Sequence, residues 1–150
     1  MVRCEMTTVI DRPIGEVFAF LADFARLPEW QPEFREVEAL AEGDVGPGSR
    51  FTYVRKTPIG VQQGTMEITT FARGSHFAWR AEPGPILPRG EMRFREVDGG
   101  TEVHEVFEAE IQGPLRVLTP LLRRSLQKDV AKDIAKAKRL LEVTGATTSR

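Results

Sequence analysis

A run of short strand-like segments between residues 35 and 111, followed by one long amphipathic helix, constrains the fold of this chain more than any other feature. The segments are separated by turn-forming clusters, namely Gly46-Pro47-Gly48, Pro58-Ile59-Gly60, Gly74, Pro83-Gly84-Pro85 and Gly99-Gly100. Strands that are joined by such short turns pair antiparallel. We therefore predict six consecutive antiparallel strands, near 35–40, 49–56, 62–71, 76–82, 90–97 and 101–111.

The segment before this run predicts one more strand and two short helices. Residues 2–10 alternate between apolar and polar side chains, which is typical of a half-buried strand. A first short helix is expected to follow, with Asp11 as its N-cap and Pro13 in its first turn. A second short helix is expected to begin at Asp23.

A long amphipathic helix closes the chain. Thr119-Pro120 is typical of a helix start, and apolar residues then recur every three or four positions. We predict a helix from Pro120 to Val143, about 36 Å long. Gly145 is expected to end it and to leave 146–150 as a disordered tail.

These elements predict a single α+β domain over residues 1–145. A sheet has one apolar face and an amphipathic helix has one apolar stripe, so the economical arrangement packs the two together. We expect a curved seven-stranded antiparallel sheet, with two short helices after its first strand and the long C-terminal helix against it. A strongly curved sheet around a straight helix leaves a gap between them, in which a small molecule can bind.

Composition excludes several classes of protein. The 150 residues are 41% hydrophobic and 29% charged, which is typical of a globular domain. A formal net charge of -1 gives no global field that recruits nucleic acid or an anionic membrane. Cys4 is the only cysteine, so no intramolecular disulfide forms. With no signal-peptide pattern and no apolar stretch of about 20 residues, we expect a soluble cytoplasmic protein, a monomer or homodimer, without a cofactor.

Short motifs stand in a characteristic order along nearly the whole chain. They are Ile10-Asp11-Arg12-Pro13 with Glu16-Val17-Phe18, Leu21-Ala22-Asp23 through Pro28-Glu29-Trp30, Gly46-Pro47-Gly48-Ser49-Arg50-Phe51, Gly100-Thr101 and Leu140-Leu141-Glu142. In these motifs the chain resembles the START-like, polyketide cyclase/dehydrase (SRPBCC) superfamily. The resemblance implies a helix-grip fold with an internal cavity, in a superfamily that includes ligand carriers, hormone receptors, aromatic-ring cyclases and co-chaperone-like modules. It brings no universal catalytic residue, so it implies ligand binding and leaves the chemistry open.

Side-chain alternation in the hairpin of strands 90–97 and 101–111 indicates which residues face the helix. If Asp98-Gly99 forms the turn, Phe94 lies opposite Val103; if Gly99-Gly100 forms it, Phe94 lies opposite Glu105. Both registers place the same residues on one face because they differ by two positions. That face carries Met92, Phe94, Val103, Glu105, Phe107, Ala109 and Ile111, and the other carries Glu91, Arg93, Arg95, His104, Glu108 and Glu110.

Glu105 is a carboxylate on an otherwise apolar face, and charged side chains are seldom fully buried without a partner. In one interpretation it is a polar anchor, or a general acid or base with a raised pKa, inside the cavity. In the other it lies near the sheet edge or the cavity mouth, where it pairs with an arginine or reaches solvent. Arg55 is the expected partner if both side chains point inward.

The inward faces of the other elements supply the remaining candidates. Trp30, between two prolines, either lines the cavity entrance or fills the core under the short helices. Tyr53 either orients a ligand through its hydroxyl or points that hydroxyl to the surface. The expected ligand-binding residues are Trp30, Phe51, Tyr53, Arg55, Met66, Ile68, Phe77, Trp79, Met92, Phe94, Glu105, Phe107, Leu122 and Leu126.

Two further features are expected at the surface. In the segment 83–88, Ile86 and Leu87 stand between prolines and are exposed unless they cover the cavity opening or meet a partner. The final helix carries many cations, together with Asp129 and Asp133, and we interpret them as a solvated face, since no aromatic residues alternate with them as in a nucleic-acid platform. The histidines, His76 and His104, fall on separate strands without ligand spacing, so we predict no metal site.

Three functions are compatible with these observations. The first is binding of a small hydrophobic molecule, such as a lipid, a polyketide or another aromatic metabolite. The second is a cyclase/dehydratase-type enzyme with Glu105 as acid or base and Tyr53 or Arg55 polarising a carbonyl group. The third is a protein-interaction module that docks a partner through the cavity rim and the segment 83–88.

Overall fold

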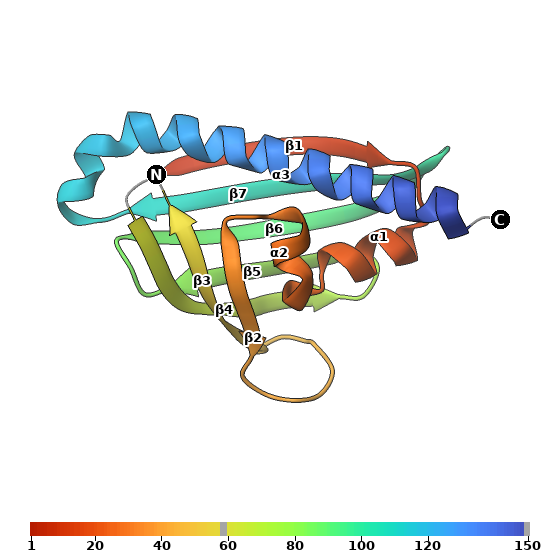
Figure 1. Cartoon of the computed structure of the whole chain (residues 1–150), viewed down its shortest axis with the longest axis horizontal. Coiled ribbons are helices and arrows are strands. Elements are labelled where there is room, and N and C mark those ends of the chain that lie inside the picture. The colour runs from red at the N-terminus through yellow and green to blue at the C-terminus, as the bar shows by residue number, and fades with distance from the viewer. Residues whose placement is uncertain (58–59, 149–150) are drawn as a thin grey trace.

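The computed structural model of the chain shows a curved seven-stranded antiparallel sheet with all helices on one side (Figure 1). It describes residues 1–57 and 60–148, with side chains as far as residue 144; Pro58 and Ile59, predicted in a turn, lie outside the described residues. The strand order is β1-β7-β6-β5-β4-β3-β2, so β1 and β2 are the two edges. The strands are β1 (Val2–Ile10), β2 (Phe34–Ala39), β3 (Arg50–Thr57), β4 (Gly60–Ala72), β5 (His76–Glu82), β6 (Ile86–Val97) and β7 (Gly100–Ile111).

The helices confirm the predicted helix-grip arrangement. In Figure 1 the long helix α3 (Thr119–Thr148) crosses the sheet lengthwise and packs along β1. The short helices α1 (Ile14–Leu21), η1 (Phe24–Arg26) and α2 (Leu27–Trp30) cover the same face beside it. A 3-10 segment, η2 (Gly113–Leu118), joins β7 to α3.

The start of the first helix differs from the prediction. Pro13, with an extended ψ of 146°, is the N-cap of α1, and no side chain caps this helix. Asp11 therefore does not cap it; instead its backbone N–H donates a hydrogen bond to Glu142 Oε2 at 2.9 Å. The second helical start is confirmed, because the Asp23 side chain accepts a hydrogen bond from the backbone N–H of Ala25.

Strand β6 begins earlier than predicted, and this shortens the exposed loop expected at 83–88 to residues 83–85. Ile86 pairs with Ile111 and Pro88 with Ala109, so β6 continues the ladder back to Ile86. The alternation of the strand turns Ile86 inward, where it is 5% exposed and packs in the core. Leu87 is half-buried, so the segment presents a smaller apolar surface than the interaction-module hypothesis assumes.

The end of α3 also differs from the prediction, since the helix continues through Gly145 to Thr148. Glycine lowers the stability of a helix by only about 1 kcal/mol relative to alanine. It therefore ends a helix only where the backbone also leaves the helical conformation. Of the predicted tail 146–150, residues 149–150 lie outside the described residues.

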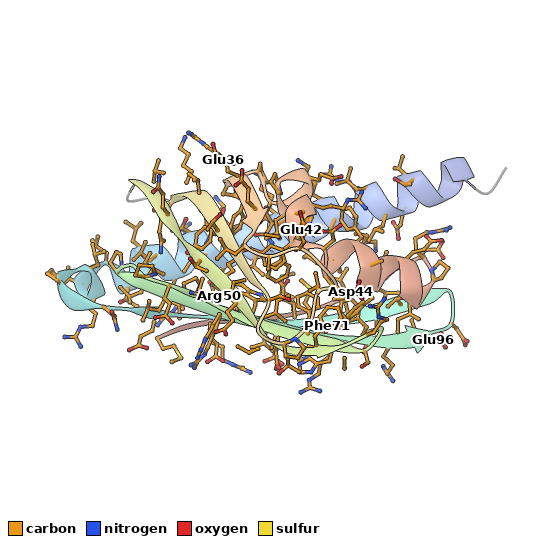
Figure 2. All side chains as sticks on the ribbon, turned by 90° about the horizontal axis from the view of Figure 1, so that it is seen from below. Glu36, Glu42, Asp44, Arg50, Phe71 and Glu96 are labelled. Atoms are coloured by element: carbon orange, nitrogen blue, oxygen red, sulfur yellow. The ribbon has the colours of Figure 1, made fainter. Side chains whose placement is uncertain are left out.

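The β6–β7 hairpin fixes which side chains reach the interior. Asp98-Gly99 forms the turn, and Phe94 lies opposite Val103, as the first of the two predicted registers requires. The outer face carries exposed ion pairs such as Arg95–Glu102, 2.9 Å apart. Figure 2 shows side chains filling the layer between sheet and helices, with Glu96 at the hairpin end and Glu36 projecting outward.

The buried side chains form two clusters, one at each end of the space under α3. The first surrounds the short helices and includes Phe18, Phe24 and Phe77, and the second lies between the start of α3 and the β1–β7 pair. Trp79 of β5 packs against both clusters. The candidate site lies where the two clusters meet.

Candidate functional site

A cavity of ≈ 60 Å³ lies between the middle of the sheet, the short helices and α3. At its apolar end, the walls are aromatic side chains and methionines from η1, β5, β6 and β7: Phe24, Phe77, Trp79, Met92 and Phe107. At its polar end, Arg55 of β3 faces Asp129 and Asp133 of α3. A second cavity of ≈ 20 Å³ shares Phe34, Arg55 and Leu126 with the first and adds Tyr53 and Leu122.

The aromatic wall is held by ring contacts and by a close approach of strand backbone. The Phe24 ring meets Phe77 edge-on at 5.9 Å between centroids, and Trp79 lies 6.2 Å from Phe107. Trp79 pairs with Gly90 across the β5–β6 ladder, and its indole lies over that glycine. A Cβ at Gly90 would lie 2.8 Å from Trp79 Nε1, so a side chain at this position would displace the indole that borders the cavity.

Glu105 is the carboxyl group inside this apolar wall. It stands on β7 between Met6 of β1 and Met92 of β6 and faces the cavity. Within the described part of the chain, it has no hydrogen-bond or ion-pair partner. Glu105 is half-buried, and burial raises its pKa from 4.5 to about 7.

Arg55 does not pair with Glu105, contrary to the prediction. Its guanidinium lies over the Phe34 ring, 5.4 Å from the centroid, and its charge acts on Asp129 and Asp133. The reason is the position of β3 near the β2 edge of the sheet, which brings Arg55 to α3 and leaves β4, β5 and β6 between it and Glu105 on β7.

Several buried polar atoms at the two cavities lack hydrogen-bond partners among the described residues. In the wall of the larger cavity these are Trp30 Nε1, Arg55 Nε and Asp133 Oδ1; Tyr53 Oη lines the smaller one, and Glu33 Oε2 lies outside both linings. Burial, and next the neighbouring Glu33 carboxylate, raise the pKa of Asp133 from 3.8 to about 8. Burial and Glu33 also raise the pKa of Asp129. Unsatisfied polar groups of this kind are costly in a folded protein and are a frequent mark of a site that a ligand completes.

The structure places most of the expected ligand-binding residues at these two cavities. Those lining the larger cavity are Trp30, Arg55, Met66, Phe77, Trp79, Met92, Glu105, Phe107 and Leu126, and those lining only the smaller one are Tyr53 and Leu122. Trp30 is 2% exposed, so it is at once a core residue and a wall residue.

Three expected residues, Phe51, Ile68 and Phe94, lie in packed core instead. All three are buried, and aromatic rings from the short helices occupy the space beside Phe94 and Phe51. Phe18 of α1 lies 5.1 Å from Phe94, and Phe24 of η1 lies 5.4 Å from Phe51. The cavity is therefore smaller than the inward face of the sheet, because rings of the short helices fill the space beside Phe94 and Phe51.

Asp129 and Asp133 are the functional candidates that the sequence interpretation missed. Their assignment to a solvated helix face is wrong for Asp133, which is 5% exposed and borders the cavity. The signal was available, since Asp133 follows the buried Leu126 by two helical turns and shares its stripe with Ile134 and Ala137. Leu21, Phe24 and Leu27 of the short helices also line the cavity. No pattern in the sequence indicates that they do.

Other chemistry finds no support in the residues that the structure describes. Among them, no group of three or more His, Cys, Asp or Glu side chains is placed to hold a metal ion. The two histidines lie on the outer face of the sheet, where His76 contacts Glu91 at 3.1 Å and His104 contacts Glu5 at 2.7 Å. No described helix is long and apolar enough to cross a membrane.

Comparison with known proteins gives one family and many similar folds. The family model described as polyketide cyclase / dehydrase and lipid transport matches residues 1–142. The sequence matches no curated protein.

Solved structures share the fold at low sequence identity. A Thermus thermophilus protein superposes with a TM-score of 0.80 at 16% identity, over 95% of this chain and 98% of its own. A Deinococcus radiodurans protein does so with a TM-score of 0.71 at 23% identity, over 96% and 99%. The di-domain ARO/CYC StfQ from the steffimycin biosynthetic pathway gives a TM-score of 0.77 at 16% identity, over 97% of this chain and 52% of its own.

Proposed function

Because the chain belongs to the polyketide cyclase / dehydrase and lipid transport family, we propose that it binds a small, largely apolar molecule in the cavity between the sheet and α3. The observation that carries this proposal is an aromatic-walled cavity at the junction of the two core clusters. A small-molecule site is typically such a space, with apolar walls and a few polar groups that fix the orientation of the ligand.

The size of the cavity limits the ligand. A water molecule needs roughly 10–15 Å³ measured in the same way. The ≈ 60 Å³ of the larger cavity therefore holds roughly four to six waters. A ligand with a single ring or a short chain fits this space, and a larger one must displace side chains or extend into the second cavity.

Filling the cavity should abolish binding. Leu126 is 5% exposed and borders both cavities, so the indole of Leu126→Trp occupies the space that the ligand needs. With 2-phenylethanol as the probe, we expect at least a tenfold loss of affinity, measured by isothermal titration calorimetry and by native mass spectrometry.

The same substitution at an exposed position of the same helix is the control. Leu121 is 63% exposed, and Leu121→Trp should change the affinity by less than twofold. If the unmodified protein retains none of a panel of single-ring alcohols and ketones, or if both variants bind equally well, the cavity is not a binding site.

A second candidate function is enzymatic, and the environment of Glu105 favours it. A carboxyl group with a pKa near 7 works both as a base and as an acid at neutral pH. In a dehydration, the Glu105 carboxylate would take the α-hydrogen of a β-hydroxyketone and return that proton to the departing hydroxyl. One C–H and one C–O bond break, a C=C bond forms, and water leaves. Arg55 lines the same cavity, but three strands separate it from Glu105, and Tyr53 lines only the smaller cavity, so neither is placed to polarise a ketone whose α-hydrogen Glu105 removes.

Glu105→Gln should slow such a reaction by at least about a hundredfold, which is the lower end of what general acid–base catalysis contributes. The substrate is 4-hydroxy-4-phenylbutan-2-one, and the ultraviolet absorbance of the conjugated enone follows the product. Binding of 2-phenylethanol, measured alongside, shows that the variant retains its cavity. An equal rate in the variant, or no rate above buffer in the unmodified protein, leaves binding as the function.

A further inference from the structure

The polar end of the cavity indicates the chemical class of the ligand. We propose that the cavity selects a small organic amine, with its protonated nitrogen between Asp129 and Asp133 and its apolar part against the aromatic wall. This inference rests on the proposed function, because it names the ligand class for the same cavity.

The first argument is the balance of charge. Asp129, Asp133 and Glu105 line the cavity, and Arg55 is the only guanidinium there among the described residues. Glu91 is a fourth lining carboxylate, and Glu33, outside the lining, acts on both aspartates. Lys128 and Lys132 also act on Asp129, but both side chains are exposed on the outer side of α3, where solvent screens them. Among the described lining residues, carboxyl groups therefore outnumber the single guanidinium, and each carboxyl that ionises can pair with a cation.

The second argument is the missing hydrogen-bond partner of Asp133. Its side chain is more than nine-tenths buried, and Oδ1 has no partner among the described residues. A buried carboxyl group without a partner is destabilising, while a buried one that is paired and hydrogen-bonded is tolerated. An ammonium group has three donors, enough to reach Asp133 and Asp129, which stand one helical turn apart and both line the cavity.

The third argument is the aromatic surface beside these carboxyls. Trp30 and Phe34 line the same end of the cavity, and the Phe34 ring already carries the Arg55 guanidinium at 5.4 Å. Aromatic rings beside carboxylates attract organic cations through their negative faces. An anionic ligand could reach Arg55 Nε, but it would come to lie near Glu33 and Asp129, whose charges repel it.

Binding of an amine should be coupled to the protonation of Asp133. The groups that face it are Glu33, Asp129 and Lys132, together with Arg55 from β3. Because burial and the Glu33 charge raise the pKa of Asp133 to about 8, the empty site carries a proton there at pH 7. An ammonium group favours the ionised carboxylate, so it expels this proton, and its affinity should increase as the pH rises from 6 to 8.

Three ligands of nearly equal shape test the proposal: 2-phenylethylamine, 2-phenylethanol and phenylacetate. Isothermal titration calorimetry at pH 6, 7 and 8, each in two buffers of different ionisation enthalpy, gives affinities and the number of protons released. We expect the amine to bind at least tenfold more tightly than the alcohol at pH 8, and phenylacetate to bind most weakly. The ratio of amine to alcohol affinity should rise with pH, with proton release on amine binding only.

Variants assign the effect to the two aspartates. Asp133→Asn and Asp129→Asn should each lower the ratio of amine to alcohol affinity at least fivefold, and thermal unfolding reports whether each variant is folded. The turn residue Asp98 supplies the control, since it is exposed and lines neither cavity; Asp98→Asn removes one carboxylate and should leave the ratio within twofold.

The outcomes separate this inference from the proposed function. If the alcohol or phenylacetate binds as tightly as the amine, or if the aspartate variants leave the ratio unchanged, the amine proposal is wrong while ligand binding in the cavity stands. If none of the three probes binds and a wider panel of single-ring ligands also fails, the proposed function itself is wrong.

Discussion

Replacing Gly100 with alanine is expected to lower the free energy of unfolding by about 3 kcal/mol or more, the largest loss for a single methyl group in this fold. Gly100 begins β7 with a φ of +151°, a backbone conformation that is strained for residues with a side chain. A Cβ there would overlap the carbonyl oxygen of Ile10 and lie 2.9 Å from the Cα of Asp11. Both atoms belong to the backbone, so neither can rotate away.

Thr101, the next residue, explains why the backbone of Gly100 lies so close to that of Ile10. Thr101 is fully buried, and its hydroxyl donates a hydrogen bond of 2.8 Å to the backbone carbonyl of Arg12. Together Gly100 and Thr101 hold the end of β1 and the start of α1 against the β6–β7 hairpin. The Gly100-Thr101 motif therefore has a structural explanation that does not involve ligand chemistry.

Gly99 in the same turn is a matched control for this prediction. Its φ is +84°, but a Cβ there would meet open space, so Gly99→Ala should cost only about 1 kcal/mol of backbone strain. Urea denaturation of both variants, followed by circular dichroism, measures the difference. If Gly100→Ala is no less stable than Gly99→Ala, the backbone contact at Ile10 is not as close as described.

The fold could be predicted from local patterns because each strand is short and closely followed by the next. Both possible turns at 98–100 place the same side chains on the inward face of the hairpin. Alternation therefore predicts that Glu105 faces inward in either register, and the observed register agrees. The predicted start of β6 and the predicted end of α3 are wrong, because a proline or a glycine does not always end a strand or a helix. Pro88 is accommodated within β6, and Gly145 within α3, since neighbouring residues continue the ladder and the helix.

The site was predicted less completely, because its limits depend on how separate layers pack. Alternation identified the inward residues of the sheet, but it could not show that Phe18 and Phe24 would fill the space beside Phe94 and Phe51. Composition also misled the interpretation of α3, where cations surround Asp133. The helical periodicity of α3 places that aspartate among buried residues, so periodicity predicts its burial better than the local composition does.

The stability of the protein should fall as the pH rises from about 4 to 9, and Asp133 should cause a large share of that loss. Burial, with Glu33, raises the pKa of Asp133 from 3.8 to about 8. Between these values the folded state holds a proton that the unfolded state has released, so the free energy of unfolding decreases with pH. Each unit of pKa difference corresponds to about 1.4 kcal/mol, so a difference of about four units sets an upper limit of roughly 6 kcal/mol on the loss at pH 9.

Asp133→Asn removes the ionisable group and keeps the shape of the side chain. We therefore expect the variant and the unmodified protein to be similarly stable at pH 4.5, and the variant to be more stable by about 3 kcal/mol at pH 9. That difference corresponds to roughly 6–12 °C in the unfolding temperature of a chain of this size. Asp98→Asn, at an exposed turn, should show no such divergence with pH. If the two variants follow the same pH profile, Asp133 is solvated, and the cavity lacks the buried carboxyl group on which selection of an amine depends.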